Sequence, residues 1–214
     1  MSDHGSRAVA TVVADASGLV ERATDSIVAI DIPIGLPSAG SRRCDLEARS
    51  ILGPRRSSVF PAPPRCTLAA PSYADACAAS AQACGKRLSK QTYAILPKVR
   101  EMDALLCAEP SLLQLVHEVH PEVCFAHWNA GEPMRHPKQS GFGFLERFRL
   151  VNDVFPGAAE AIRESVPRSQ ATDDDILDAL AALWTARRIR DGVAVRLGDP
   201  IEHDARGIPM QIWA

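Results

Sequence analysis

The sequence is poor in the features that would place it in several large classes of protein. Aromatic residues make up only 5% of the 214 residues, and no apolar run approaches the roughly 20 residues that a membrane-spanning helix requires. No secretory signal opens the chain, and neither sign of charge predominates, because 24 Lys and Arg face 26 Asp and Glu. We therefore expect a cytoplasmic protein that has no membrane contact and binds any polyanion through a local patch.

Two common chemical motifs are also missing. The six cysteines form neither a CxxC pair nor the paired clusters of a zinc site, so we expect reduced thiols. There is no Gly-rich phosphate loop of the P-loop type to support nucleotide binding.

The apolar pattern, at 46% of the residues, predicts one α/β domain spanning residues 1–214. Strands are expected over 7–14, 19–23, 27–32 and 113–120, with the first two as a hairpin and the tail 208–213 closing a sheet edge. Helices are expected over 43–52, 72–85, 89–107 and 172–190, and others begin near 122, 141 and 158. Residues 53–71 hold five prolines and read as a loop, and Pro97 implies a kink or break in its helix. The order places a helical insertion after the strand that ends near Asp31.

Asp31 is unusual because it follows the apolar run 27–30, in a strand that should be covered on both faces. A lone carboxylate there would be costly unless it is paired or bound to a metal. It lies at the carboxyl end of the strand, where open α/β sheets bind ligands. Two interpretations carry equal weight: a ligand site, or a structural Asp that pairs with a nearby Arg or caps the turn at Pro33.

Asp174, Asp175 and Asp178 share one arc of the helix predicted for 172–190. First-turn acidic residues are explained by the helix dipole, with Thr172 or Asp173 as the N-cap. Asp178 lies a full turn further in, where Asp has poor helix propensity. Carboxylates that meet beside Asp31 repel one another unless a divalent cation neutralises them.

Glu118 belongs to the segment His117-Glu118-Val119-His120, which is one residue short of the zinc-protease motif and is predicted as a strand. On a strand His117 and His120 point to opposite faces, so they cannot share a metal, whereas Glu118 and His120 share a face. Glu118 is therefore a candidate fourth ligand, with a surface carboxylate as the alternative.

Positive charge is concentrated between residues 41 and 66, where six arginines face two acidic residues. Guanidinium groups suit phosphates, and Ser57 and Ser58 add hydroxyl donors. The alternative is a solvated basic loop and helix.

Several of these segments also form a family pattern. They are Val28-Ala29-Ile30-Asp31-Ile32-Pro33-Ile34-Gly35-Leu36-Pro37, Arg43-Cys44-Asp45 with Arg49, the stretch 52–60, the stretch 97–103, the stretch 118–122 and the stretch 174–182. In this order they resemble the domain-of-unknown-function family 429, whose members are predicted nucleases of the ribonuclease H-like fold. The resemblance extends over nearly the whole chain.

The resemblance implies a central five-stranded mixed sheet, flanked by helices, with metal-bound carboxylates at its centre. Asp31 is implied on the fourth strand, and Asp175 with Asp178 on the last helix, whose D-x-x-D-A-L pattern is similar to that of Holliday-junction resolvases. The first strand of the fold normally ends in a metal-bridging Asp. A gapless comparison puts Asp3 at that place, so the first strand is expected to be truncated. The sheet edge that this exposes would favour a homodimer.

We therefore predict a nuclease that uses Mg²⁺ or Mn²⁺ to hydrolyse phosphodiester bonds in nucleic acid. The metal ligands would be Asp3, Asp31, Asp175 and Asp178; the catalytic set would be Asp31, Asp175, Asp178 and Glu118. The phosphate-binding residues would be Arg42, Arg43, Arg55 and Arg56. Two alternatives stay open. One is a nucleic-acid-binding module whose activity was lost with the first-strand Asp, and the other is a metal-dependent hydrolase of a small phosphorylated compound.

Overall fold

The fold is known from a computed structural model, which describes residues 8–21 and 25–214. Within these residues β1 (Val28–Ile30) pairs in parallel with β2 (Val116–Glu118). The second pair is antiparallel and consists of β3 (Arg196–His203) and β4 (Pro209–Trp213). A single bridge between Val119 and Trp213 joins the two pairs. The α/β class is confirmed, with a smaller sheet in the described residues than the expected five strands.

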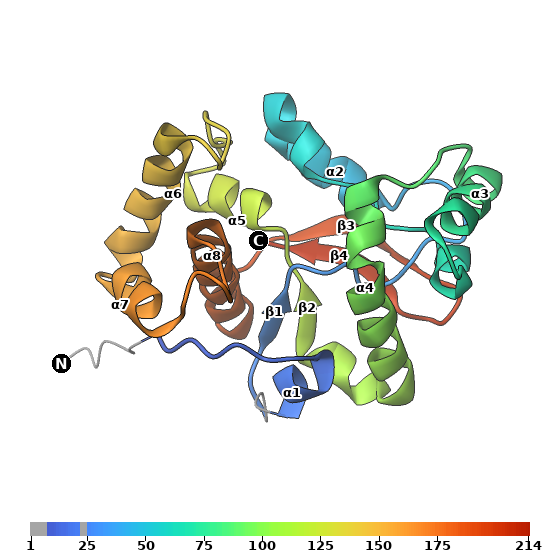
Figure 1. The fold of residues 1–214 in the computed structure, drawn as a ribbon, viewed down its shortest axis with the longest axis horizontal. Helices are drawn as coiled ribbons and strands as arrows, with labels where there is room; N and C mark the ends of the chain where they lie inside the picture. Colours follow the sequence, from blue (N-terminus) through green and yellow to red (C-terminus); the bar gives the residue numbers. More distant parts are fainter. Residues whose placement is uncertain (1–7, 22–24) are drawn as a thin grey trace.

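The helices fall into two groups on either side of the strands (Figure 1). Between β1 and β2 in the chain lie α2 (Arg43–Leu52), η1 (Gly53–Ser58), η2 (Arg65–Ala69), α3 (Tyr73–Cys84), α4 (Lys90–Ala108) and η3 (Pro110–Gln114). The second group comprises α5 (Pro121–Trp128), α6 (Gly141–Val154), α7 (Ala158–Ser165) and α8 (Asp173–Arg190). The helical insertion predicted after Asp31 is confirmed.

Local capping signals explain why several helix boundaries were predictable. The Ser72 hydroxyl accepts a hydrogen bond from the backbone N–H of Asp75 at the start of α3, and Gly85 ends that helix with φ +68°. Ser89 caps α4 in the same way. That helix continues through Pro97 without a break, because residues on both sides of it, including Leu96 and Val99, are anchored in the core.

The hairpin expected over 7–14 and 19–23 is wrong wherever the structure describes these residues. Residues 8–14 form no regular element, and α1 (Ala16–Glu21) replaces the second strand, while residues 7, 22 and 23 lie outside the described ranges. The Asp15 carboxylate accepts a hydrogen bond from the Gly18 N–H, so the presumed turn residues instead start a helix. Leu19 and Val20 then pack into the core beside α4.

The other strand predictions differ in length. The strand expected over 113–120 is reduced to β2, because residues 113 and 114 belong to η3. The C-terminal strand is confirmed as β4. Its partner β3 was missed, because its sequence lacks apolar alternation and contains Pro200.

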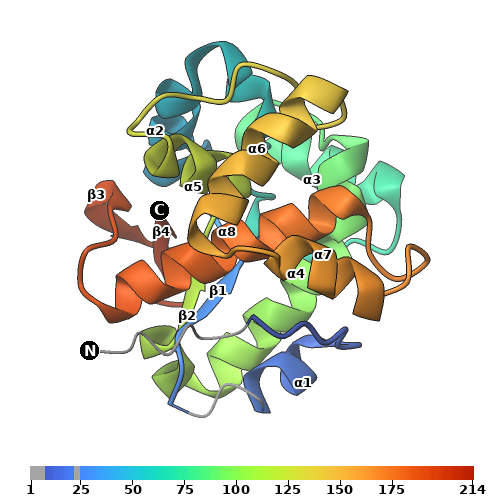
Figure 2. The same cartoon turned by 90° about the vertical axis from the view of Figure 1, so that its left-hand side faces the viewer.

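The largest apolar cluster fixes α8 against β1. Ile176, Leu177 and Leu180 are buried with side chains of α5, α6 and α7. Figure 2 shows α8 crossing β1, which brings the middle of this helix near the carboxyl ends of the parallel strands. No helix within the described ranges is long and apolar enough to cross a membrane.

Candidate active site

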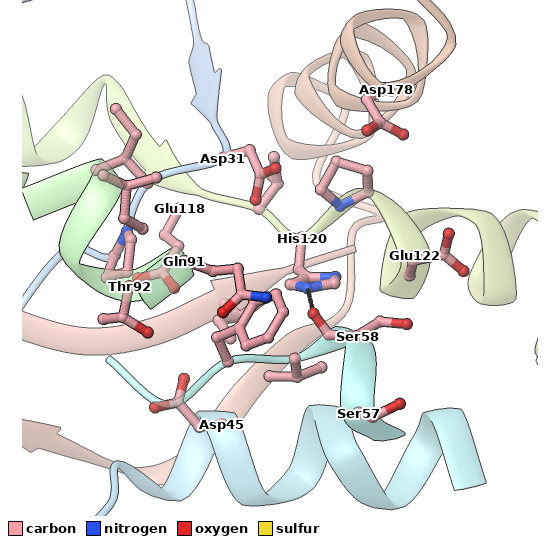
Figure 3. A pocket seen from close by; sticks show the side chains of 18 of the residues that line it. Asp31, Asp45, Ser57, Ser58, Gln91, Thr92, Glu118, His120, Glu122 and Asp178 are labelled. Carbon is pink, nitrogen blue, oxygen red and sulfur yellow. Dashed lines mark hydrogen bonds between the residues drawn. The ribbon is translucent and has the colours of Figure 1, made fainter. Parts of the chain in front are cut away.

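A cavity of about 480 Å³ lies at the carboxyl ends of β1 and β2 (Figure 3). Its walls come from segments that are far apart in the sequence. They are formed by residues 31–33, Arg42, Asp45, Arg55, 57–60, Gln91, Thr92, Ile95, 118–122, 137–139, Asp178 and Ile212. The ends of parallel strands are where α/β sheets commonly place ligands. Asp31, which the sequence offered as a candidate ligand-site residue, lies on the wall of this cavity.

Asp31 and Asp178 line this cavity together. The Asp31 side chain is accessible to solvent, yet the protein around its carboxyl group displaces water and so raises its pKa. The nearby His120 and Lys138 act in the opposite direction and lower the pKa. Burial raises the pKa of Asp178 to about 6, with Lys138 opposing the rise and the charges of Asp31 and Glu122 adding to it. The charge of Asp31 thus adds to the cost of ionising Asp178, and the site favours a positive charge near these carboxylates.

Lys138 supplies a positive charge beside Asp178. Its Nζ donates a hydrogen bond of 2.8 Å to Oδ2 of Asp178, and the side chain of Lys138 is 34% exposed while that of Asp178 is 17% exposed. Burial by itself would lower the pKa of Lys138, but Asp178 outweighs this effect and the pKa is raised. Sequence reasoning missed Lys138, because nothing in its local sequence distinguishes it from a surface lysine.

His120 presents an unpaired nitrogen at the cavity. Its Nε2 lies 3.2 Å from the carbonyl oxygen of Ser58, which only accepts hydrogen bonds, so Nε2 carries the proton. Nδ1 is buried and has no hydrogen-bond partner among the described residues. In the neutral ring Nδ1 is therefore a free acceptor. The sequence placed His120 on the same face as Glu118 but assigned it no role.

Arg55 supplies unpaired positive charge to the same cavity. Its Nε is buried without a hydrogen-bond partner, and no described carboxylate forms an ion pair with its guanidinium. Ser57 and Ser58 line the wall beside it. Of the four arginines predicted to bind phosphate, Arg55 lines the cavity and keeps its donors unused. Arg43 and Arg56 are exposed and lie outside the cavity.

Arg42 and Glu118 are corrected by the structure, because they neutralise each other inside the protein. The two terminal nitrogens of Arg42 lie 2.7 Å from the two carboxylate oxygens of Glu118, and Asp45 accepts two further hydrogen bonds from the guanidinium. Glu118 also accepts the N–H of Ile34 at 2.6 Å. Burial opposes the charge on both groups: it raises the pKa of Glu118 to about 7 although Arg42 lowers it, whereas Asp45 and Glu118 raise the pKa of Arg42 well above the usual value. The guanidinium therefore stays charged, and its hydrogen bonds to both Glu118 oxygens favour the carboxylate form. Arg42 thus has no free donor for a phosphate, and both Glu118 oxygens are already engaged.

Asp175 is also placed differently from the prediction. Its Oδ2 accepts the backbone N–H of Thr172 at 2.7 Å, and the Thr172 hydroxyl accepts the N–H of Asp175 at 3.2 Å. These reciprocal bonds form a capping box at the start of α8. Asp175 is exposed there and does not line the cavity. Asp3, the remaining predicted metal ligand, lies outside the described residues.

Residues 1–203 match the family described as "Protein of unknown function (DUF429)". The chain belongs to this family. The match confirms the family resemblance and leaves the activity to be argued from the site. No curated protein and no solved structure matches the chain.

Asp31 and Asp178 are the carboxylates of this DUF429 chain that line the cavity without an arginine partner among the described residues. Arg42 pairs with Asp45 and Glu118, and Arg147 pairs with Glu122. Within the described ranges no three His, Cys, Asp or Glu side chains are grouped as a metal site. Mg²⁺ in phosphate-handling proteins is usually held by one or two carboxylates together with water and substrate oxygens. Asp31 and Asp178 meet that pattern. Glu122 adds no free oxygen pair, because Arg147 binds both of its oxygens at 2.7 Å.

Proposed function

We propose that this protein is a divalent-metal-dependent phosphodiesterase that acts on nucleic acid. The observation that carries the proposal is that Asp31 and Asp178 line one cavity together with Arg55, whose Nε has no hydrogen-bond partner among the described residues. A carboxylate pair suits Mg²⁺ or Mn²⁺, and an unused guanidinium suits a phosphate. The two kinds of group that a metal-assisted phosphoryl site would need therefore line one cavity.

Asp31 and Asp178 would hold the ion from different elements, the end of β1 and the second turn of α8. When bound, a divalent ion lowers the pKa of a water and neutralises charge on phosphoryl oxygens. Asp31 and Asp178 would bind it only as carboxylates, so both protons must leave first.

The remaining cavity residues would orient the substrate. Arg55 would bind a non-bridging phosphate oxygen, with the hydroxyls of Ser57 and Ser58 as further donors. Lys138 would add positive charge near the phosphate when it is released from Asp178.

The ribonuclease H-like interpretation of the fold is part of this proposal. It is supported by the parallel pairing of β1 with β2, by Asp31 at the end of β1 and by the passage of α8 across β1. The homodimer predicted from the sequence stays a prediction.

The test is cleavage of labelled single- and double-stranded DNA and RNA by the full chain with Mn²⁺ or with EDTA. Asp178→Asn should reduce cleavage to the level seen in EDTA while circular dichroism shows an unchanged fold. Asp153→Asn is the matched control, because Asp153 is exposed on α6 and outside the cavity. Cleavage that survives in Asp178→Asn would refute the proposal, and salt-sensitive binding without any turnover would favour the binding module.

A second candidate, hydrolysis of a small phosphorylated compound, is favoured by the size of the cavity. About 480 Å³ lies within the range of small-molecule sites. Competition between a chromogenic phosphate ester and an oligonucleotide distinguishes the two. An ester that is turned over and is not displaced by the oligonucleotide would select the small-molecule hydrolase.

A further inference from the structure

Phe60 is an exposed aromatic residue at the wall of the active-site cavity. Its exposed fraction is 47%, although Val59 just before it is fully buried. Single exposed apolar side chains are common on protein surfaces, but Phe60 lies on the wall of a cavity, where a bound ligand would contact it.

The backbone on both sides of Phe60 is held firmly. Nη1 of Arg49 donates to the carbonyl oxygen of Val59 at 2.6 Å, and the N–H of Ala62 donates to Oδ2 of Asp45 at 3.1 Å. Pro61 further restricts the backbone of Phe60 to extended conformations. A ligand that stacks on the ring therefore loses little binding free energy to the ordering of this segment.

The α4 side of the cavity supplies complementary groups. Ile95 is 36% exposed, and Gln91, also exposed, points into the pocket in Figure 3. The amide of Gln91 forms no hydrogen bond with any described residue. An amide offers both donors and an acceptor, which is the pattern that the edge of a nucleobase also presents.

We propose that Phe60, Ile95 and Gln91 form a nucleobase-binding site next to the phosphate-binding Arg55. This inference rests on the proposed function and specifies its substrate. Phe60 offers a flat face for stacking, Ile95 an apolar contact, and Gln91 hydrogen bonds to the base edge. A base inside a duplex has both its faces and its pairing edge covered, so the site selects single-stranded nucleic acid or an unpaired end.

Binding is measured in EDTA, where no cleavage occurs, with a short single-stranded oligonucleotide and the same backbone without bases. The wild-type protein should bind the base-containing strand more tightly. Phe60→Leu, which keeps an apolar side chain but loses the aromatic face, should weaken that binding about ten-fold and leave abasic binding unchanged. Phe142→Leu is the control, because Phe142 is 73% exposed on α6 and outside the cavity.

Stacking has its own optical signature. The emission of 2-aminopurine placed in the strand should be quenched on binding to the wild-type protein and to Phe60→Trp, and less by Phe60→Leu. Gln91→Met should change the preference among the four bases while the quenching persists.

The outcomes separate this inference from the proposed function. Equal binding of base-containing and abasic strands, or no binding of either, would overturn the base site even in a protein that cleaves. Base binding that depends on Phe60, without cleavage in Mn²⁺, would support the base site and overturn the phosphodiesterase. Equal binding of duplex and single strand by the wild-type protein would also contradict the inference.

Discussion

Nζ of Lys138 lies 2.8 Å from Oδ2 of Asp178, on the wall of the cavity that also contains Asp31. The chain thus provides its own cation beside the carboxylate pair. This ion pair lowers the cost of holding two acidic side chains in one site without a bound ion. It also means that a divalent ion must compete with Lys138 for Asp178.

The first prediction concerns this competition. Lys138→Met should increase the affinity for Mn²⁺ about five-fold, because the ammonium no longer neutralises Asp178. Titration calorimetry measures the affinity, and Lys98→Met, an exposed change on α4, serves as the control. A weaker affinity in Lys138→Met would show that the lysine does not oppose the ion.

The second prediction compares two adjacent arginines. Arg55→Gln should weaken oligonucleotide binding about ten-fold and lower the slope of log affinity against log salt by about 0.7, which corresponds to one phosphate contact on a single strand. Arg56→Gln should change both little, because Arg56 is exposed and outside the cavity. Equal effects in the two variants would indicate a diffuse basic surface in place of a phosphate site.

The third prediction tests the corrected role of Glu118. Glu118→Gln leaves Arg42 with an incomplete set of counter-charges inside the protein, so the free energy of unfolding should fall by about 3 kcal/mol. Urea denaturation provides the measurement. Asp191→Asn, which removes one member of an exposed ion pair, should have little effect. Unchanged stability with lost cleavage would instead restore the catalytic role predicted from the sequence.

The fourth prediction follows from the pKa of Asp178, which burial raises from its usual 3.8 to about 6. The folded protein then binds this proton more tightly than the unfolded chain does. The free energy of unfolding should therefore fall as the pH rises from about 4 to 6, by on the order of 2 kcal/mol. Asp178→Asn should lose this contribution, so the variant gains stability relative to the wild type across that window. Parallel pH profiles of the two proteins, measured by urea denaturation, would contradict the assignment.

The sequence was most informative where short-range physics decides the outcome. Ser72, Ser89 and Thr172 are helix caps in the structure, and their hydroxyls accept hydrogen bonds from N–H groups three residues later. The same kind of local signal gave a wrong prediction at residues 15–18. Asp15 and Gly18 suit a helix start as well as the hairpin turn that was predicted there. Only packing against α4 distinguishes the two.

The sequence by itself determined the family, the α/β class and most helices. It also showed that Asp31 follows an apolar run and that Asp178 lies a full turn inside a helix, which are unusual places for a carboxylate. Tertiary structure decided which charges remain available for chemistry. Arg42 and Arg55 are chemically identical, yet one is neutralised by a carboxylate 76 positions away and the other has no described partner. Caps and apolar periodicity act over a few residues, whereas charge neutralisation depends on which distant side chains the fold brings into contact. That contact set is a property of the packed chain, so a local pattern cannot reveal it.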